Sequence, residues 1–103
     1  MHATIGRYEG FDANRTEELT RKVDESLVPE LRKLEGFSGF YFIETERGVL
    51  SSVGLFEDPT QIDEATKVAA SWVKSEGLES ALPNAPKITT GKVVAQDNRI
   101  AVA

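Results

Sequence analysis

The sequence contains no cysteine, and histidine, methionine and tryptophan occur once each. The lack of cysteine excludes disulfide bonds, thiolate metal ligands and a cysteine nucleophile. The single histidine, His2, has no cluster of carboxylates near it in the sequence, which argues against a metal site. We therefore expect neither a disulfide framework nor a metal centre.

Basic residues are also scarce, since twelve lysines and arginines stand against seventeen acidic residues, giving a net charge of −5. Without a basic face, the protein is not expected to bind nucleic acid or an anionic membrane surface. No apolar run approaches the roughly 20 residues of a membrane span. The first residues, MHATIGRYEG, do not resemble a signal peptide. These features predict a cytoplasmic protein.

The clearest pattern is an apolar stripe from Leu19 to Leu34, in which leucine and valine recur every three or four residues. This spacing predicts a helix running to about residue 35. Asn14 and Glu17 form a capping-box pair at its start, and Gly36 is expected to end it in the left-handed conformation. Pro29 should bend the helix, either to follow a twisted sheet or to shape a pocket.

A second helix is predicted to begin at Asp58-Pro59-Thr60-Gln61 and to end at Gly77. Asp58 suits the cap and Pro59 the first helical position. Strands are predicted for Ala3–Glu9, residues 37–46 and 49–57, and Ile88–Ala95. The tail DNRIAVA could extend the last strand or leave the sheet.

This β-α-β-β-α-β order predicts one domain over residues 1–103. The fold class is α+β and ferredoxin-like, with an antiparallel four-stranded sheet and both helices on one face.

The segment GFSGFYFI, residues 36–43, places large side chains on both faces of its strand. Phe40 and Phe42 share one parity, and Tyr41 and Ile43 share the other. Two helices cover only one face, and leaving the second in water would forfeit several kcal/mol of a total stability of about 5–15 kcal/mol. We therefore expect a two-fold copy to cover it in a homodimer, with Tyr41 and Ile43 at the interface. The alternative is a monomer with an exposed apolar patch.

The element order and the segments LEGFSGFYF and LFEDPTQIDEA resemble those of the antibiotic biosynthesis monooxygenase-like proteins, members of the dimeric α+β barrel superfamily. The resemblance implies a homodimer with a hydrophobic cavity between sheet and helices in each protomer. Some relatives oxidise fused-ring aromatic compounds with molecular oxygen and no metal, flavin or other cofactor. Others open haem, and many have no established activity.

This chain departs from the family pattern at several positions. Many relatives carry a histidine in the first turns of the second helix, where this sequence has Ala65 and no histidine. The haem-degrading relatives pair a first-strand asparagine, a second-helix tryptophan and a following histidine. Only Trp72 is present here. Haem degradation is therefore disfavoured, because the axial ligand is missing.

Five residues are candidates to line the implied cavity: Trp72, Phe40, Phe42, Arg7 and His2. Trp72 could stack on an aromatic ligand or simply fill core. Arg7 needs either a ligand anion or an ion pair with a glutamate such as Glu9. His2 is the only side chain whose usual pKa lies near neutrality, although it sits beside the first residue. No catalytic residue is predicted.

Two functions remain open on these grounds. One is a cofactor-free monooxygenase acting on a small aromatic or polyketide-like molecule. The other is a non-catalytic dimer that binds a small hydrophobic ligand or supports a stress response. The missing histidine at Ala65 favours the second.

Overall fold

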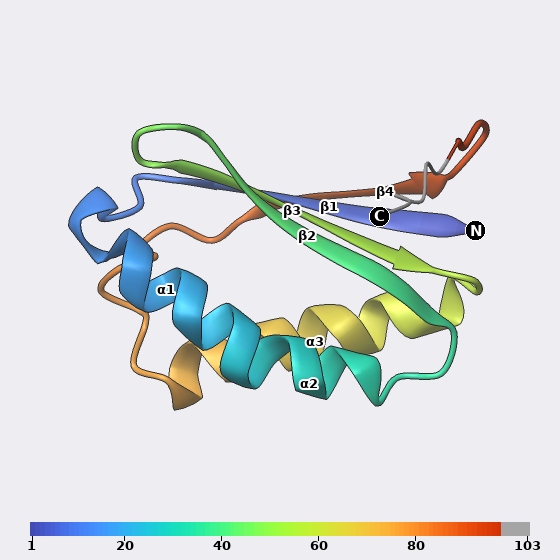
Figure 1. Ribbon diagram of the computed structural model, residues 1–103, viewed down its shortest axis with the longest axis horizontal. Helices are drawn as coiled ribbons and strands as arrows, with labels where there is room; N and C mark the ends of the chain where they lie inside the picture. Colours follow the sequence, from blue (N-terminus) through green and yellow to red (C-terminus); the bar gives the residue numbers. More distant parts are fainter. Residues whose placement is uncertain (98–103) are drawn as a thin grey trace, which may run out of the picture.

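The computed structural model describes residues 1–97 as a four-stranded sheet with helices on one side (Figure 1). All strand pairs are antiparallel, in the order β2-β3-β1-β4. The predicted α+β ferredoxin-like fold is confirmed. In chain order, the elements are β1 (His2–Glu9), η1 (Ala13–Arg15), α1 (Thr16–Lys22), η2 (Val23–Leu27), α2 (Val28–Arg32), β2 (Phe37–Glu46), β3 (Val49–Phe56), α3 (Thr60–Ser75) and β4 (Lys87–Lys92).

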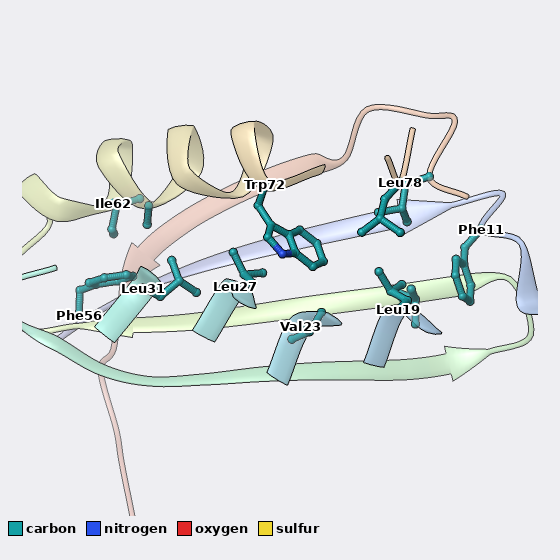
Figure 2. Close-up of a cluster of buried hydrophobic side chains, with 12 residues drawn as sticks. Phe11, Leu19, Val23, Leu27, Leu31, Phe56, Ile62, Trp72 and Leu78 are labelled. Carbon is teal, nitrogen blue, oxygen red and sulfur yellow. The ribbon is translucent and has the colours of Figure 1, made fainter. Parts of the chain in front are cut away.

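The first helical segment buries most of the predicted stripe, but α2 ends at Arg32, earlier than the predicted residue 35, and Leu34 is half-buried just beyond it. Leu19, Val23, Leu27 and Leu31 all lie in the core, which also includes Phe56 (Figure 2). The helix cap predicted at Asn14 lies two residues earlier, at Asp12. The Asp12 carboxylate accepts the Asn14 backbone N–H at 3.1 Å. A short 3₁₀ turn then separates this cap from α1.

The bend expected from Pro29 takes the form of a π-helical turn, η2, directly before α2. The Val28 N–H donates to the carbonyl of Val23, five residues back. Inside this turn, the Ser26 hydroxyl donates to the Lys22 carbonyl at 2.7 Å and accepts the indole N–H of Trp72, also at 2.7 Å. The irregular turn therefore provides the contact that ties the first helical segment to α3.

The second helix, α3, follows the predicted signals closely. The Asp58 carboxylate accepts the Thr60 N–H at 2.9 Å, and Gly77 has a φ of 67° just beyond the helix. Ile62, Ala65 and Trp72 are buried on its inner side. The cap also lowers the pKa of Asp58, since a hydrogen-bonded carboxylate is favoured over the acid.

The sheet face turned away from the helices is open in the part of the chain that the structure describes (Figure 1). We call it the outer face. Strand register places Tyr41, Val53, Ile5 and Thr89 in one row across it. Tyr41 is 59% exposed, and Ile5 and Ile43 are each 44% exposed. The two dimer-interface candidates therefore lie on this face.

The last strand ends at Lys92, earlier than the predicted Ala95. The Val93 N–H then donates to the Met1 carbonyl at 2.9 Å. Most of the tail DNRIAVA, from residue 98 on, lies outside the described residues. Within residues 1–97, no helix is long and apolar enough to cross a membrane.

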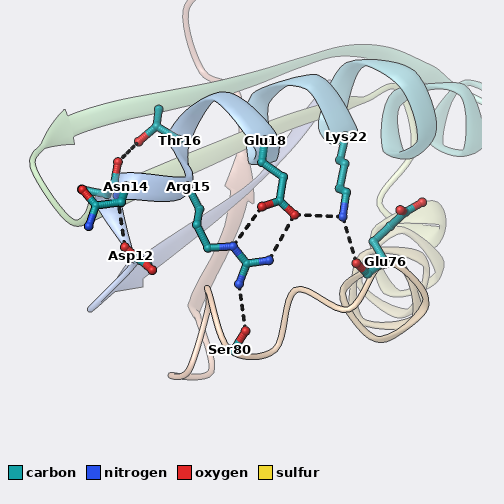
Figure 3. Close-up of polar contacts among 9 residues, drawn as sticks. Asp12, Asn14, Arg15, Thr16, Glu18, Lys22, Glu76 and Ser80 are labelled. Carbon is teal, nitrogen blue, oxygen red and sulfur yellow. Dashed lines mark hydrogen bonds and ion pairs between the residues drawn. The ribbon is translucent and has the colours of Figure 1, made fainter.

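A polar cluster ties α1 to the segment after α3 (Figure 3). The Glu18 carboxylate accepts from Arg15 at 3.0 and 3.1 Å and from Lys22 at 3.0 Å. Arg15 also donates to the Ser80 hydroxyl at 2.8 Å, and Lys22 to the Glu76 carbonyl at 3.1 Å. These donors lower the pKa of Glu18 to about 2.

This cluster predicts an acid-sensitive contribution to stability. Because the pKa of Glu18 falls from 4.5 to about 2 on folding, its contribution is complete above pH 4.5 and disappears as the pH drops toward 2. Glu18→Gln should lower the free energy of unfolding at pH 7 and leave it nearly unchanged at pH 2. Urea unfolding at several pH values measures this difference.

The matched control is Glu17→Gln, since Glu17 is exposed and makes no ion pair with another described residue. Equal effects of both substitutions at pH 7 would contradict a specific role for the Glu18 cluster.

Candidate functional site

The site that the fold provides is an open-sided cavity of about 320 Å³ between the sheet and α3. This volume is at the lower end of the range of small-molecule pockets, about 300–1,000 Å³. We call it the sheet–helix cavity. It is lined by Thr4, Tyr8, Leu31, Phe40, Ser52, Gly54, Phe56, Ala65, Thr66, Ala69, Ala70, Val73, Pro86 and Ile88.

The cavity exists because both of its walls are built from small residues. On α3, Ala65, Ala69 and Ala70 face it, and on β3 Gly54 lies opposite. A Cβ atom at Gly54 would stand 3.1 Å from the Thr4 methyl carbon and 3.3 Å from the Phe56 ring. Larger side chains at these positions would fill the space that a ligand would use.

The mouth of the cavity lies between α3 and β4. Thr66, Ala70 and Ile88 line the cavity and are exposed, whereas Phe56 and Ala65, deeper inside, are buried. This difference arises because β4 is an edge strand with every residue exposed. A ligand would therefore enter beside Ile88.

Three hydroxyl groups supply most of the polarity on the sheet side. Thr4 and Tyr8 come from β1, and Ser52 comes from β3. Burial raises the pKa of Tyr8 above 10.0, so its phenol stays protonated at neutral pH and can donate a hydrogen bond. The Tyr8 ring packs edge-on against Phe42, with centroids 6.2 Å apart, and this contact orients it.

Among the residues that the structure describes, the cavity lining contains no carboxylate, histidine, lysine or arginine. Residues 1–97 also hold no group of histidine and acidic side chains suited to a metal ion. The arrangement can hold an apolar molecule and hydrogen-bond its polar edge. Proton transfer at neutral pH would have to involve groups of the ligand or water, because the lining offers no base of suitable pKa.

The five candidates from the sequence do not come together. Phe40 lines the sheet–helix cavity, while Phe42 stacks on Phe40 at 6.3 Å and faces a smaller groove beside the first helical segment. His2 is half-buried at the start of β1, opposite Phe56 and Lys92. It does not line the cavity.

Trp72 and Arg7 also lie away from the cavity. The Trp72 side chain is buried among core residues beside Leu27 and Val23, and its N–H is held by Ser26 (Figure 2). Arg7 is on the outer face, where it forms an ion pair with Glu9 at 2.8 Å. That glutamate is one of the counter-charges that the sequence suggested.

Sequence reasoning missed the residues that define the cavity, namely Thr4, Tyr8, Ser52 and Gly54. One feature of the sequence could have indicated the cavity. The inward parity of β3 reads Leu50, Ser52, Gly54 and Phe56, so two small residues interrupt an otherwise large apolar row. Small residues at the centre of a buried face indicate missing volume or close packing, and the sequence does not distinguish the two.

Comparison with known proteins rests on structure, because no protein-family model matches this sequence and no curated protein matches it. A Nitrosomonas europaea protein of unknown function, NE2512, is 15% identical with a TM-score of 0.73, over 97% of this chain and 95% of that one. The Streptomyces coelicolor monooxygenase ActVA-Orf6, solved with nanaomycin D, is 12% identical with a TM-score of 0.68, over 96% and 92%.

A dimeric ferredoxin-like protein from an uncultured marine organism is 15% identical with a TM-score of 0.67, over 96% of this chain and 92% of that one. A protein described as an antibiotic biosynthesis monooxygenase is also among the matching structures. The shared feature is the fold. The resemblance drawn from the sequence is therefore confirmed at the level of the fold.

Proposed function

We propose that this protein is a homodimer that binds a small hydrophobic or aromatic molecule in the sheet–helix cavity and oxidises it with molecular oxygen, without a cofactor. The observation that carries the proposal is the apolar cavity of about 320 Å³ with hydroxyl groups on one wall. The shared fold with ActVA-Orf6, a monooxygenase solved with nanaomycin D, supports it. The dimeric description of another neighbour supports the homodimer.

The proposed reaction is oxidation of an activated methylene carbon between aromatic rings to a carbonyl. The carbon loses two hydrogens and gains one atom of dioxygen, and the second atom leaves with these hydrogens as water. Water at the open side of the cavity takes one proton of the methylene group, because the lining offers no base. The resulting carbanion supplies the electrons and attacks oxygen directly. The chain's contribution is to orient the rings between Phe40, Phe56 and α3 and to shelter the carbanion from bulk water.

The test is oxygen uptake with a hydroxyanthrone substrate in buffer free of metal and flavin. Wild-type protein should accelerate uptake and yield the quinone. Ala70→Phe should reduce the rate at least tenfold, because a phenyl group at this exposed lining position would block the mouth. An oxygen electrode and product absorbance measure both quantities.

The control is Ser71→Phe, which adds the same ring at the next residue of α3, outside the cavity lining. Its rate should equal that of wild type. No uptake above the uncatalysed rate with wild-type protein would overturn the oxygenase proposal.

A second candidate is a non-catalytic dimer that binds the same class of molecule. The cavity-lining residues that the structure describes include no carboxylate, histidine, lysine or arginine, and this favours the second candidate, because the Tyr8 phenol stays protonated and no other side chain there would remove a proton from the ligand near neutral pH. Binding of anthrone-type compounds without oxygen uptake, again blocked by Ala70→Phe, would select this function.

A further inference from the structure

We infer that the groove beside the first helical segment is a second binding site, and that it takes a small aromatic amine in its protonated form. The groove has a volume of about 210 Å³ and lies between α1–η2–α2 and the helix-facing side of β2. We call it the edge groove. It is lined by Thr20, Val23, Asp24, Val28, Phe40 and Phe42. The inference concerns a different site from the sheet–helix cavity and does not depend on the proposed function.

The edge groove is formed by one row of side chains on each of two neighbouring elements. On the helical side, Thr20, Asp24 and Val28 recur every fourth residue, and all three border the groove. On the sheet side, Phe40 and Phe42 stand at alternate positions of β2 and therefore point to the same face. The groove follows from the way these two rows run alongside each other.

The edge groove is accessible because β2 is an edge strand among the described residues. Figure 1 shows β2 and the first helical segment on the same side of the molecule. Thr20 and Asp24 are exposed, and Phe40 and Phe42 are only half-buried although they lie in the helix-facing row of the strand. A small molecule could enter from this side without moving any element. The outer face, where we propose the homodimer forms, is on the other side of the sheet.

The floor of the edge groove suits an aromatic ring. The Phe40 and Phe42 rings stack with centroids 6.3 Å apart and planes 18° from parallel. The Tyr8 ring packs edge-on against Phe42 with centroids 6.2 Å apart, so Phe42 is held in place from behind. Val23 and Val28 contribute apolar side chains from the helical side. A ring in the groove would pack against aromatic and aliphatic groups, which stabilise aromatic ligands through apolar burial and ring stacking.

The charge of the edge groove selects a cation. Asp24 supplies the one charged side chain among the described lining residues, and its carboxylate forms no ion pair with another described residue. A second carboxylate, that of Glu44, continues the Phe40–Phe42 row and accepts the Thr16 hydroxyl at 3.4 Å. Both walls are therefore acidic next to an apolar floor. An ammonium group complements this charge, whereas a carboxylate would be repelled.

The volume limits the size of the amine. About 210 Å³ is below the range of about 300–1,000 Å³ for typical small-molecule pockets. The groove therefore has room for one ring with a short chain. Such a molecule would place its ring on Phe40 and Phe42 and its ammonium group beside Asp24.

The test uses three probes of similar shape that differ in charge: phenethylamine, phenethyl alcohol and 3-phenylpropionate. Titrations followed by the backbone amide signals in NMR spectra locate the site and give the affinity. Phenethylamine should shift the amides of Thr20, Asp24 and Phe42. It should bind about 3- to 5-fold more tightly than the neutral alcohol, as expected for one solvent-exposed ion pair. The propionate should bind most weakly.

Asp24→Asn should remove the preference for the amine over the alcohol. The matched control is Glu25→Gln, which removes one carboxylate at the next residue, exposed and outside the groove lining. It should keep the preference. Ala70→Phe, which blocks the mouth of the sheet–helix cavity, should also leave the affinity for phenethylamine unchanged, because the two sites have separate entrances.

Equal affinity of wild-type protein for the amine and the alcohol would overturn the edge groove as an amine site. A preference that survives Asp24→Asn, or the absence of any shift at the groove amides, would overturn it as well. Loss of phenethylamine binding in Ala70→Phe would do the same, because it would place the probe in the sheet–helix cavity. Each of these results would leave the proposed function standing, since oxygen uptake tests that function separately.

Discussion

Val53→Lys is expected to convert the proposed homodimer into a folded monomer. Val53 lies at the centre of the outer face, paired with Tyr41 on one side and Ile5 on the other. Both neighbours are large, apolar and exposed in the isolated chain. Burying this row against a two-fold copy is the driving force that the proposed homodimer requires.

A lysine at this position opposes association in two ways. It must lose water at the interface, and a two-fold copy packed over the centre of the outer face would bring a second lysine toward it. Juxtaposed like charges cost several kcal/mol, so the dimer dissociation constant should rise more than about 100-fold. Sedimentation should show wild type at twice the 11.3 kDa chain mass and the variant at the single mass.

The control substitution is Val94→Lys, the same chemical change at a position that is 91% exposed and outside the sheet. It should remain a dimer. Far-ultraviolet circular dichroism distinguishes a folded monomer from an unfolded variant. Wild-type protein that is monomeric at tens of micromolar would contradict the homodimer directly.

Phe56→Ala is expected to cause the largest loss of stability of any substitution considered. Phe56 is 1% exposed and packs edge-on against Phe37, with centroids 5.8 Å apart. It belongs to the same core cluster as Leu31 and Ile62 (Figure 2). Truncating a buried phenylalanine costs about 3–5 kcal/mol, because apolar burial is lost and a cavity remains.

For a chain of this size, each kcal/mol corresponds to about 4–8 °C in melting temperature, so a decrease of more than 10 °C is expected. Thermal and urea unfolding should be measured at one protein concentration, since the proposed dimerisation would make stability depend on concentration. The control Val94→Ala removes a side chain that is 91% exposed and should change stability by less than about 0.5 kcal/mol. A loss below about 1 kcal/mol for Phe56→Ala would contradict the packing described.

Much of the architecture was predictable because it depends on local patterns. The spacing from Leu19 to Leu31 identifies a buried helical face, and all of these stripe residues are in the core. Gly48, with a φ of 84°, lies in the turn between β2 and β3, where a left-handed residue was expected. These features require only neighbouring residues in one segment, so the sequence carries them directly.

The candidate site was predicted less well, for reasons that particular residues illustrate. Trp72 shares a helix with the cavity-lining alanines, yet its indole turns toward Ser26 in the π-helical turn. Pro29 predicts a bend at this point, but the local pattern does not specify that the bend takes the form of a π-helical turn or that Ser26 accepts the Trp72 N–H. The sequence did not identify Tyr8 as a cavity residue, because a single tyrosine in a strand can face the core, a cavity or solvent.

By itself, the sequence determined the order of the elements, the buried side of each helix and the apolar character of both faces of β2. These follow from periodicity and from the free energy of burying apolar surface. Only the tertiary structure decided which side chains share the cavity. The register between β1 and β3 places Ser52 opposite Gly6, between Thr4 and Tyr8, and the alanines of α3 line the facing wall of the cavity. The volume of the cavity depends on how separate segments pack against one another. The spacing of residues within one segment carries no information about that packing.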